Sequence, residues 1–155
     1  MSTRPPIELI NRAAEQLGDL VGDVVFLGGA VVGLLLSDRG GPPVRATRDV
    51  DVAIELGPRF LDQHALDRRL LELGFKNDMH GPTCRYLHEF TVIDVIPVGS
   101  EKDDANPWYR LALDSSWEHL LANHVRINVI SPACFLGTKV AAFRSPEREY
   151  HDDIF

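Results

Sequence analysis

Two aspartates separated by a single residue, Asp49 and Asp51, are the first side chains whose types and spacing suit chemistry. They open the segment 49–55, in which apolar residues alternate with polar or small ones, as in a strand buried on one face. Side chains two apart in a strand share a face, so the two carboxylates would lie side by side and repel each other. Mg²⁺ takes oxygen ligands and would relieve that repulsion. Taken alone, the pair is more typical of a solvated strand end.

A third aspartate, Asp94, lies inside the apolar run 92–96, which we expect to be buried on both faces. An unpaired carboxylate there would be energetically costly or would take up a proton. A cation shared with Asp49 and Asp51 would compensate its charge. The alternative is a structural role, in which Asp94 caps a turn or pairs with an arginine such as Arg85. We expect the three carboxylates to converge on one site.

A pair of glycines, Gly28 and Gly29, separates an apolar strand expected over 23–27 from an apolar helix expected over 30–36. Glycines at such a junction allow close approach of the backbone, and the start of the helix offers free N–H groups to a phosphate. Close packing of the helix on the strand explains the pair equally well. The junction is therefore a candidate phosphate site.

Lys139 lies on the last complete helix that we expect, which starts at Ser131-Pro132 and runs to about residue 144. On a helical wheel, Lys139 falls inside the apolar arc formed by Phe135, Leu136, Val140 and Phe143. An inward-facing ammonium group needs an anionic partner, which a triphosphate or the acidic cluster would supply. The alternative is a lysine whose head group reaches past the apolar surface to water.

The elements that position these residues alternate between helices and strands. The hydrophobic periodicity predicts helices over 5–18, 30–36, 58–73 and 132–144, and strands over 23–27, 49–55, 83–88, 90–96, 117–122 and 125–130. Segment 37–47 is rich in Gly, Pro and Arg and is expected to be a loop. A looser region follows the strand over 90–96, and the last two strands form a hairpin that turns at Asn123-His124.

Composition and charge restrict the class of protein. The chain has 155 residues, of which 45% are hydrophobic and 25% charged, as expected for one globular domain. We find neither an apolar stretch as long as a membrane span nor a secretory signal. Cys84 and Cys134 suit two reduced thiols of a cytoplasmic protein. A formal charge of −7 argues against a broad nucleic-acid surface and leaves room for a local basic patch.

The motifs together resemble the nucleotidyltransferase superfamily of DNA polymerase β, and most closely the AbiEii/AbiGii toxin type. The segments that carry the resemblance, in order, are 26–30 (FLGGA), 45–51 (RATRDVD), 73–75 (LGF), 84–86 (CRY), 93–97 (IDVIP), 139–144 (KVAAFR) and 151–154 (HDDI). They extend over residues 22–155, nearly the whole chain. Each segment is a weak signal, and the ordered set is fairly specific.

The resemblance implies an α/β (α+β) nucleotidyltransferase fold, with a mixed central sheet flanked by helices. It implies a single domain over 1–155, whose last segment, 146–155, ends within an expected helix and suits a truncated C-terminal helix. Asp49 and Asp51 would bind the catalytic Mg²⁺, as one ion or two, with Mn²⁺ as a substitute. Asp94 would complete the metal site and help to deprotonate the attacking hydroxyl.

The same resemblance implies a nucleotide site. Gly28 and Gly29 would hold the phosphates, and Lys139 matches a late lysine that contacts the nucleotide. The family's late acidic position falls on Asp152 or Asp153, of which we select Asp153. One departure is Gly29 itself, because the superfamily often has a serine there, so a hydroxyl contact to phosphate is missing.

The activity implied is transfer of a nucleoside monophosphate from an NTP to a hydroxyl of tRNA or protein, in a cytoplasmic toxin–antitoxin or phage-defence system. An antitoxin or toxin chain would be its partner, and no membrane is involved. One alternative is a non-catalytic nucleotide-binding or antitoxin-type interaction module on the same fold. A phosphohydrolase of the haloacid-dehalogenase type also uses Asp-x-Asp, but that pair follows an apolar strand near the N-terminus, unlike Asp49 and Asp51.

Overall fold

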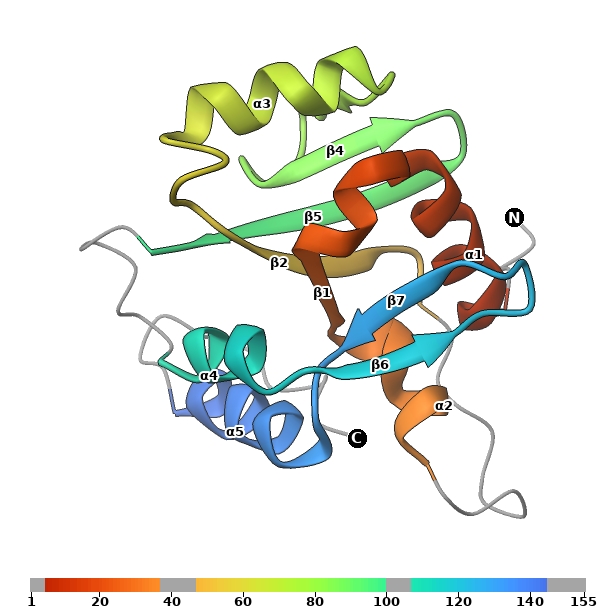
Figure 1. Ribbon diagram of the computed structural model, residues 1–155, viewed down its shortest axis with the longest axis vertical. Coiled ribbons are helices and arrows are strands. Elements are labelled where there is room, and N and C mark those ends of the chain that lie inside the picture. Colours follow the sequence, from red (N-terminus) through yellow and green to blue (C-terminus); the bar gives the residue numbers. More distant parts are fainter. Residues whose placement is uncertain (1–4, 37–46, 100–106, 145–155) are drawn as a thin grey trace.

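A mixed seven-stranded sheet forms the centre of the computed structural model, which describes residues 5–36, 47–99 and 107–144 (Figure 1). The strands are β1 (Val24–Leu27), β2 (Val50–Glu55), β3 (Lys76–Asn77), β4 (Arg85–His88), β5 (Thr91–Val98), β6 (Trp117–Leu120) and β7 (Arg126–Val129). The helices are α1 (Pro6–Leu17), α2 (Val32–Leu35), α3 (Gln63–Glu72), α4 (Trp108–Asp114) and α5 (Pro132–Phe143), with 3₁₀ turns η1 (Gly18–Asp23) and η2 (Gly29–Val31).

The strand order is β3-β4-β5-β2-β1-β7-β6. β2 runs parallel to β5 and β1 runs parallel to β7, whereas the other neighbouring pairs are antiparallel. The sequence-based prediction of an α/β domain with a mixed central sheet is therefore confirmed. The predicted hairpin is confirmed as well, because β6 and β7 pair on either side of Asn123 and His124.

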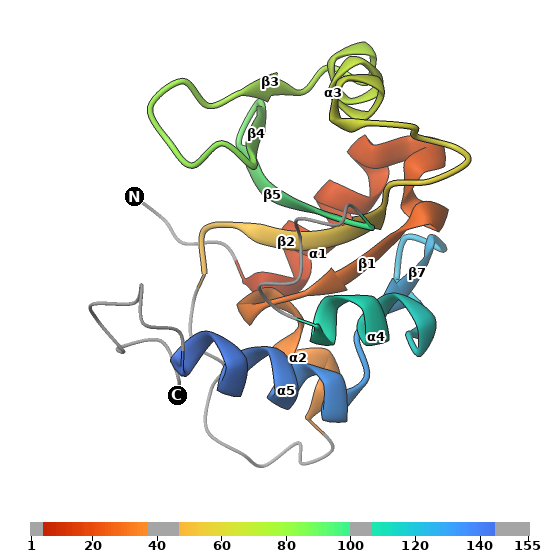
Figure 2. The ribbon, with the colours of Figure 1, turned by 90° about the vertical axis from the view of Figure 1, so that its left-hand side faces the viewer.

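Helices cover the two faces of the sheet differently (Figure 2). Gln16 of α1 hydrogen-bonds the ring of His88, and Tyr86 donates its hydroxyl proton to Asp67 of α3. Tyr86 and His88 are two residues apart on β4, so α1 and α3 lie on one face of the sheet. α4 lies on the other face against β1 and β2, and α5 packs on α4. Asp49, Asp51 and Asp94 lie on the α4 face.

Local sequence accounts for where the helices begin and end. Pro6 stands at the first position of α1, and Gly18 follows the helix with a φ of 57°. The side chain of Asp62 accepts a hydrogen bond from the backbone N–H of Ala65 and caps α3. Ser131 caps α5 in the same way. No helix in the described ranges is long and apolar enough to cross a membrane.

Four expectations about the elements need correction. The helix expected over 58–73 begins only at Gln63, because Asp62 caps it. The segment 30–36 is a 3₁₀ turn followed by the single-turn helix α2, not one continuous helix. The region that looked loose contains α4, and β3 was not predicted. Most of the expected loop 37–47, and all of 146–155, lie outside the described residues.

Candidate metal and nucleotide site

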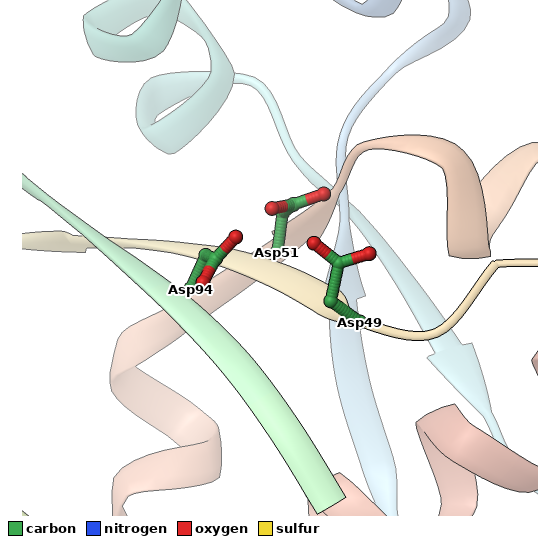
Figure 3. A group of neighbouring side chains, drawn as sticks. All are labelled: Asp49, Asp51 and Asp94. Atoms are coloured by element: carbon green, nitrogen blue, oxygen red, sulfur yellow. The ribbon is translucent and has the colours of Figure 1, made fainter. Parts of the chain in front are cut away.

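Strand pairing aligns the candidate residues in one row across the sheet. Asp51 on β2 is the register partner of Asp94 on the parallel strand β5, and Asp94 is the partner of Arg85 on β4. Leu27, the last residue of β1, stands opposite Asp51. Register partners project to the same face, so the carboxylates of Asp51 and Asp94 lie side by side. Asp49 precedes β2 by one residue and points to the same place (Figure 3).

The three carboxylates are close enough to share a cation. One oxygen from each of Asp49, Asp51 and Asp94 lies within 4.8 Å of the others, and all three residues are half-buried. The expectation that the three converge is therefore met. Their roles as metal ligands and catalytic groups remain predictions.

Arg85 is already bound to two of the three carboxylates. Its Nε donates to Asp94 Oδ1 over 2.9 Å, and its Nη2 donates to Asp94 Oδ2 over 3.0 Å. The same Nη2 reaches Asp49 Oδ2 over 3.2 Å. The structural alternative for Asp94, pairing with an arginine, is thus present alongside the cluster. A bidentate arginine–carboxylate pair of this kind is among the strongest side-chain interactions, because both partners are charged and two hydrogen bonds form in parallel.

Burial of Asp94 differs from the sequence-based expectation. β5 alternates between buried and half-buried residues, with Ile93 and Val95 buried and Asp94 on the more open face. The run 92–96 is therefore not buried on both faces. Helix α4 packs mainly on the neighbouring strands β1 and β2. Asp94 has a partner in Arg85, so its burial alone does not require a metal ion.

Asp51 is the carboxylate whose environment is unfavourable. Burial, together with the negative charges of Asp49 and Asp94, raises the pKa of Asp51 to about 7. The positive charges of Lys139 and Arg85 act in the opposite direction and do not cancel this effect. Between residues that the structure describes, no hydrogen bond to the Asp51 carboxylate is formed. An added cation would therefore stabilise the ionised form of Asp51.

Gly28 and Gly29 have different surroundings. Gly28 has a φ of 75° and a ψ of −165°, a conformation that only glycine adopts readily. A Cβ at Gly28 would lie 2.0 Å from Asp51 Oδ2, so the side chain of Asp51 packs directly on this glycine. A Cβ at Gly29 would meet nothing within 4 Å, which leaves open space where η2 begins. The close packing of the Asp51 carboxylate explains why position 28 has no room for a side chain. Phosphate binding by Gly28 or Gly29 stays a prediction.

Lys139 lies near the carboxylates, but the reason derived from the helical wheel was wrong. Leu136 is 63% exposed, and the buried residues of α5 are instead Cys134, Gly137 and Thr138. Gly137 is buried because the indole of Trp108 on α4 sits against it. α5 is apolar nearly all round, so the wheel could not identify its inner face. Lys139 is half-buried, with Nζ 5.6 Å from the centroid of the Phe135 ring.

Sequence reasoning gave Arg85 only a structural role and did not identify Tyr109, although both lie near the site. Arg85 was considered only as a structural partner of Asp94, although the alternation along β4 already places it on a definite face. Tyr109 of α4 carried no signal, because its segment was not recognised as a helix. Burial and the charge of Asp51 raise the pKa of the Tyr109 hydroxyl, so this ring borders the cluster. Asp153, the proposed late acidic residue, lies outside the described residues.

Two hollows among the described residues lie away from the carboxylates. A cavity of about 270 Å³ is found at the opposite end of β1 and β2, beside Val24, Glu55 and Arg59. An apolar groove of about 280 Å³ separates α1 from α2. Neither is lined by the candidate residues. Charge and geometry therefore identify the site better than concavity does.

Comparison with known proteins supports the fold but does not identify a family or a substrate. No protein-family model matches the sequence, and no curated protein matches it. Among solved structures, the chain is similar to an antigenic nucleotidyltransferase-like protein from Paracoccidioides brasiliensis, with a TM-score of 0.68 and 20% identity. The likeness covers 96% of this chain and 71% of that protein. The chain therefore has a nucleotidyltransferase-like fold, with three clustered carboxylates on the sheet face that α4 leaves partly open.

Proposed function

We propose that this protein is a magnesium-dependent nucleotidyltransferase, which transfers a nucleoside monophosphate from an NTP to an acceptor hydroxyl. The observation that carries the proposal is the convergence of Asp49, Asp51 and Asp94 within 4.8 Å on a nucleotidyltransferase-like fold. An acidic cluster alone is common on protein surfaces. Here the fold and the raised pKa of Asp51 support a catalytic use.

The residues present fit a divalent cation. Asp49, Asp51 and Asp94 offer only carboxylate oxygens, which suit Mg²⁺ or Mn²⁺ and not a soft metal. Asp51 also has an unfavourable charge that a cation would relieve. When bound, one or two such ions would neutralise the triphosphate and polarise the α-phosphate.

In the reaction, the acceptor oxygen forms a bond to the α-phosphorus, the bond between that phosphorus and the bridging oxygen breaks, and pyrophosphate leaves. The proton of the hydroxyl would pass to Asp94. Arg85 uses two of roughly four lone-pair positions of that carboxylate, so Asp94 keeps room to accept a proton while Arg85 holds its orientation. Lys139 and the Gly28-Gly29 backbone would contact the phosphates, and Asp153 would add the late acidic group.

The acceptor and the biological setting rest on the sequence resemblance to AbiEii/AbiGii-type proteins. It favours tRNA or a protein as acceptor, a cytoplasmic toxin–antitoxin or phage-defence system, and an antitoxin or toxin chain as partner. Among the described residues, the cations Arg85 and Lys139 act on the carboxylates. They could contact an RNA backbone despite the net negative charge.

The direct test is incubation of the protein with each α-labelled NTP, Mg²⁺, and either total tRNA or cell lysate. Label should appear in one acceptor class and disappear in Asp51→Asn. Glu55→Gln is the matched control, because Glu55 lies on the same strand but is exposed and pairs with Arg110. Equal labelling by Asp51→Asn and the unchanged protein would remove the carboxylates from the mechanism. Nucleotide binding without transfer to any acceptor would instead favour the non-catalytic interaction module.

A further inference from the structure

The ion pair of Arg85 differs from the other ion pairs among the described residues. The side chain of Asp94 is only 13% exposed, whereas the carboxylates of the other ion pairs there are 28–66% exposed. A less solvated pair is screened less, so its charges act more strongly on a third charge nearby. The third charge to consider is a divalent cation at the cluster.

Arg85 reduces what the cluster can offer to a cation. It takes one hydrogen bond on each oxygen of Asp94 and a third on Asp49 Oδ2, all of them candidate ligand atoms. The three carboxylates carry three formal negative charges. Arg85 and Lys139 bring two positive charges close to them. A free divalent cation would therefore enter a site whose net attraction is small and which already holds a guanidinium group.

A triphosphate changes this balance because it brings several negative charges of its own. On the proposed function, we infer that Arg85 is a positioning residue that weakens cation binding to the nucleotide-free site. The cation then binds well only together with the triphosphate. Linkage requires the reverse as well, so the cation must raise affinity for the triphosphate by the same factor. The two hydrogen bonds from Arg85 keep the Asp94 carboxylate oriented until the cation and the triphosphate bind.

Arg85→Gln removes the charge and can keep one hydrogen bond to Asp94, whereas Arg85→Lys keeps the charge and loses the bidentate pairing. Arg69→Gln is the matched control, because Arg69 forms ion pairs with Asp19 and Glu72 far from the cluster. Calorimetric titration with Mn²⁺ alone should show about 5- to 150-fold tighter binding by Arg85→Gln, the usual range for coupled sites. Arg85→Lys and Arg69→Gln should stay near the unchanged protein. A merely structural role of Arg85 would weaken Mn²⁺ binding instead.

A second measurement uses inorganic tripolyphosphate, which carries the charge of an NTP without a base. Thermal unfolding with Mn²⁺, with tripolyphosphate and with both should show much more than additive stabilisation in the unchanged protein, and nearly additive stabilisation in Arg85→Gln. If Arg85→Gln is unfolded without metal, recovery of its circular dichroism by Mn²⁺, at concentrations that leave the unchanged protein unaffected, supports the inference. No recovery by Mn²⁺ that saturates the unchanged protein overturns it.

Equal or weaker Mn²⁺ binding by Arg85→Gln would overturn the inference, and so would Arg85→Lys that binds as tightly as Arg85→Gln. These outcomes leave the proposed function standing if the unchanged protein binds Mn²⁺ with tripolyphosphate. Failure of the unchanged protein to bind Mn²⁺ under either condition would instead reject the proposed metal site itself.

Discussion

The two faces of the central strands consist of alternate residues of the same segments, yet they have opposite properties. Val50, Val52 and Ile93 are fully buried on the face that α1 covers. Asp51 and Asp94, their immediate neighbours in sequence, lie half-buried on the other face and repel each other. The covered face stabilises the fold, whereas the mutual repulsion of the carboxylates on the other face, the carboxylate face, lowers stability. Substitutions on the two faces should therefore affect different measurable properties.

Truncation on the covered face should have the largest effect on stability. Ile93→Ala should lower the free energy of unfolding by about 2–5 kcal/mol, because it leaves a cavity in a packed core. Ile96→Ala is the matched control, since Ile96 lies on the same strand but is half-buried on the carboxylate face. Urea titrations of both variants compare the two faces directly. A cost for Ile96→Ala as large as that for Ile93→Ala would mean that the faces do not differ as described.

On the carboxylate face, removal of a positive charge should affect binding and not folding. Lys139→Met keeps the length of the side chain and should lower NTP affinity in the presence of Mg²⁺ by about 1.5–3 kcal/mol, the range for hydrogen bonds to charged groups. Lys76→Met, on the exposed strand β3, is the control. Calorimetric titration of NTP into both variants measures the difference. Equal affinities would exclude Lys139 from the site.

Gly28 connects the two properties, since this half-buried residue of the backbone packs directly against the Asp51 carboxylate. Gly28→Ala should cost about 1–3 kcal/mol in stability, because alanine adopts this backbone conformation with strain. Its methyl group would also displace the Asp51 carboxylate, so Mn²⁺ binding should weaken. Gly29→Ala meets open space and serves as the control for unfolding. If Gly28→Ala bound Mn²⁺ as the unchanged protein does, the contact with Asp51 would be unimportant for the site.

The most gradual effect expected is a pH dependence of stability without metal. The pKa of Asp51 rises from an ordinary 3.8 to about 7 on folding, so between these values the folded protein holds a proton that the unfolded chain has lost. Stability contributed by protonated Asp51 should therefore fall as pH rises from 4 to 7, by at most about 1.4 kcal/mol per pH unit. Asp51→Asn lacks this contribution, so its stability relative to the unchanged protein should increase with pH.

Thermal unfolding of both proteins at pH 5, 6 and 7 in the presence of a chelator measures this difference. Asp51→Asn should be folded throughout and should match or exceed the unchanged protein at pH 7. A difference that stays constant with pH would show that Asp51 is ionised normally. Addition of Mn²⁺ together with tripolyphosphate should reverse the order at pH 7, because only the unchanged protein keeps all three carboxylates.

Much of the secondary structure could be read from the sequence because the signals are local. The alternation in 49–55 identified β2 and placed Asp49 and Asp51 on one face, since side chains two apart in a strand must share a face. Ser131 followed by proline marked the start of α5 by a capping preference that involves only neighbouring residues. The helix of the loose region was missed because α4 is short, and it is held by packing of Trp108 on Gly137.

What the sequence by itself determined was the type of most elements and the chemistry of the candidate residues. The tertiary structure decided which strands are neighbours and in what register. The parallel pairing of β2 with β5 places Asp51 beside Asp94, and the pairing of β4 with β5 places Arg85 on the carboxylates. A period of two assigns a residue to a face but carries no information about its partner on another strand. Burial of Asp94 and the orientation of α5 likewise depend on which helix covers which strand, and that arises only from contacts between distant segments.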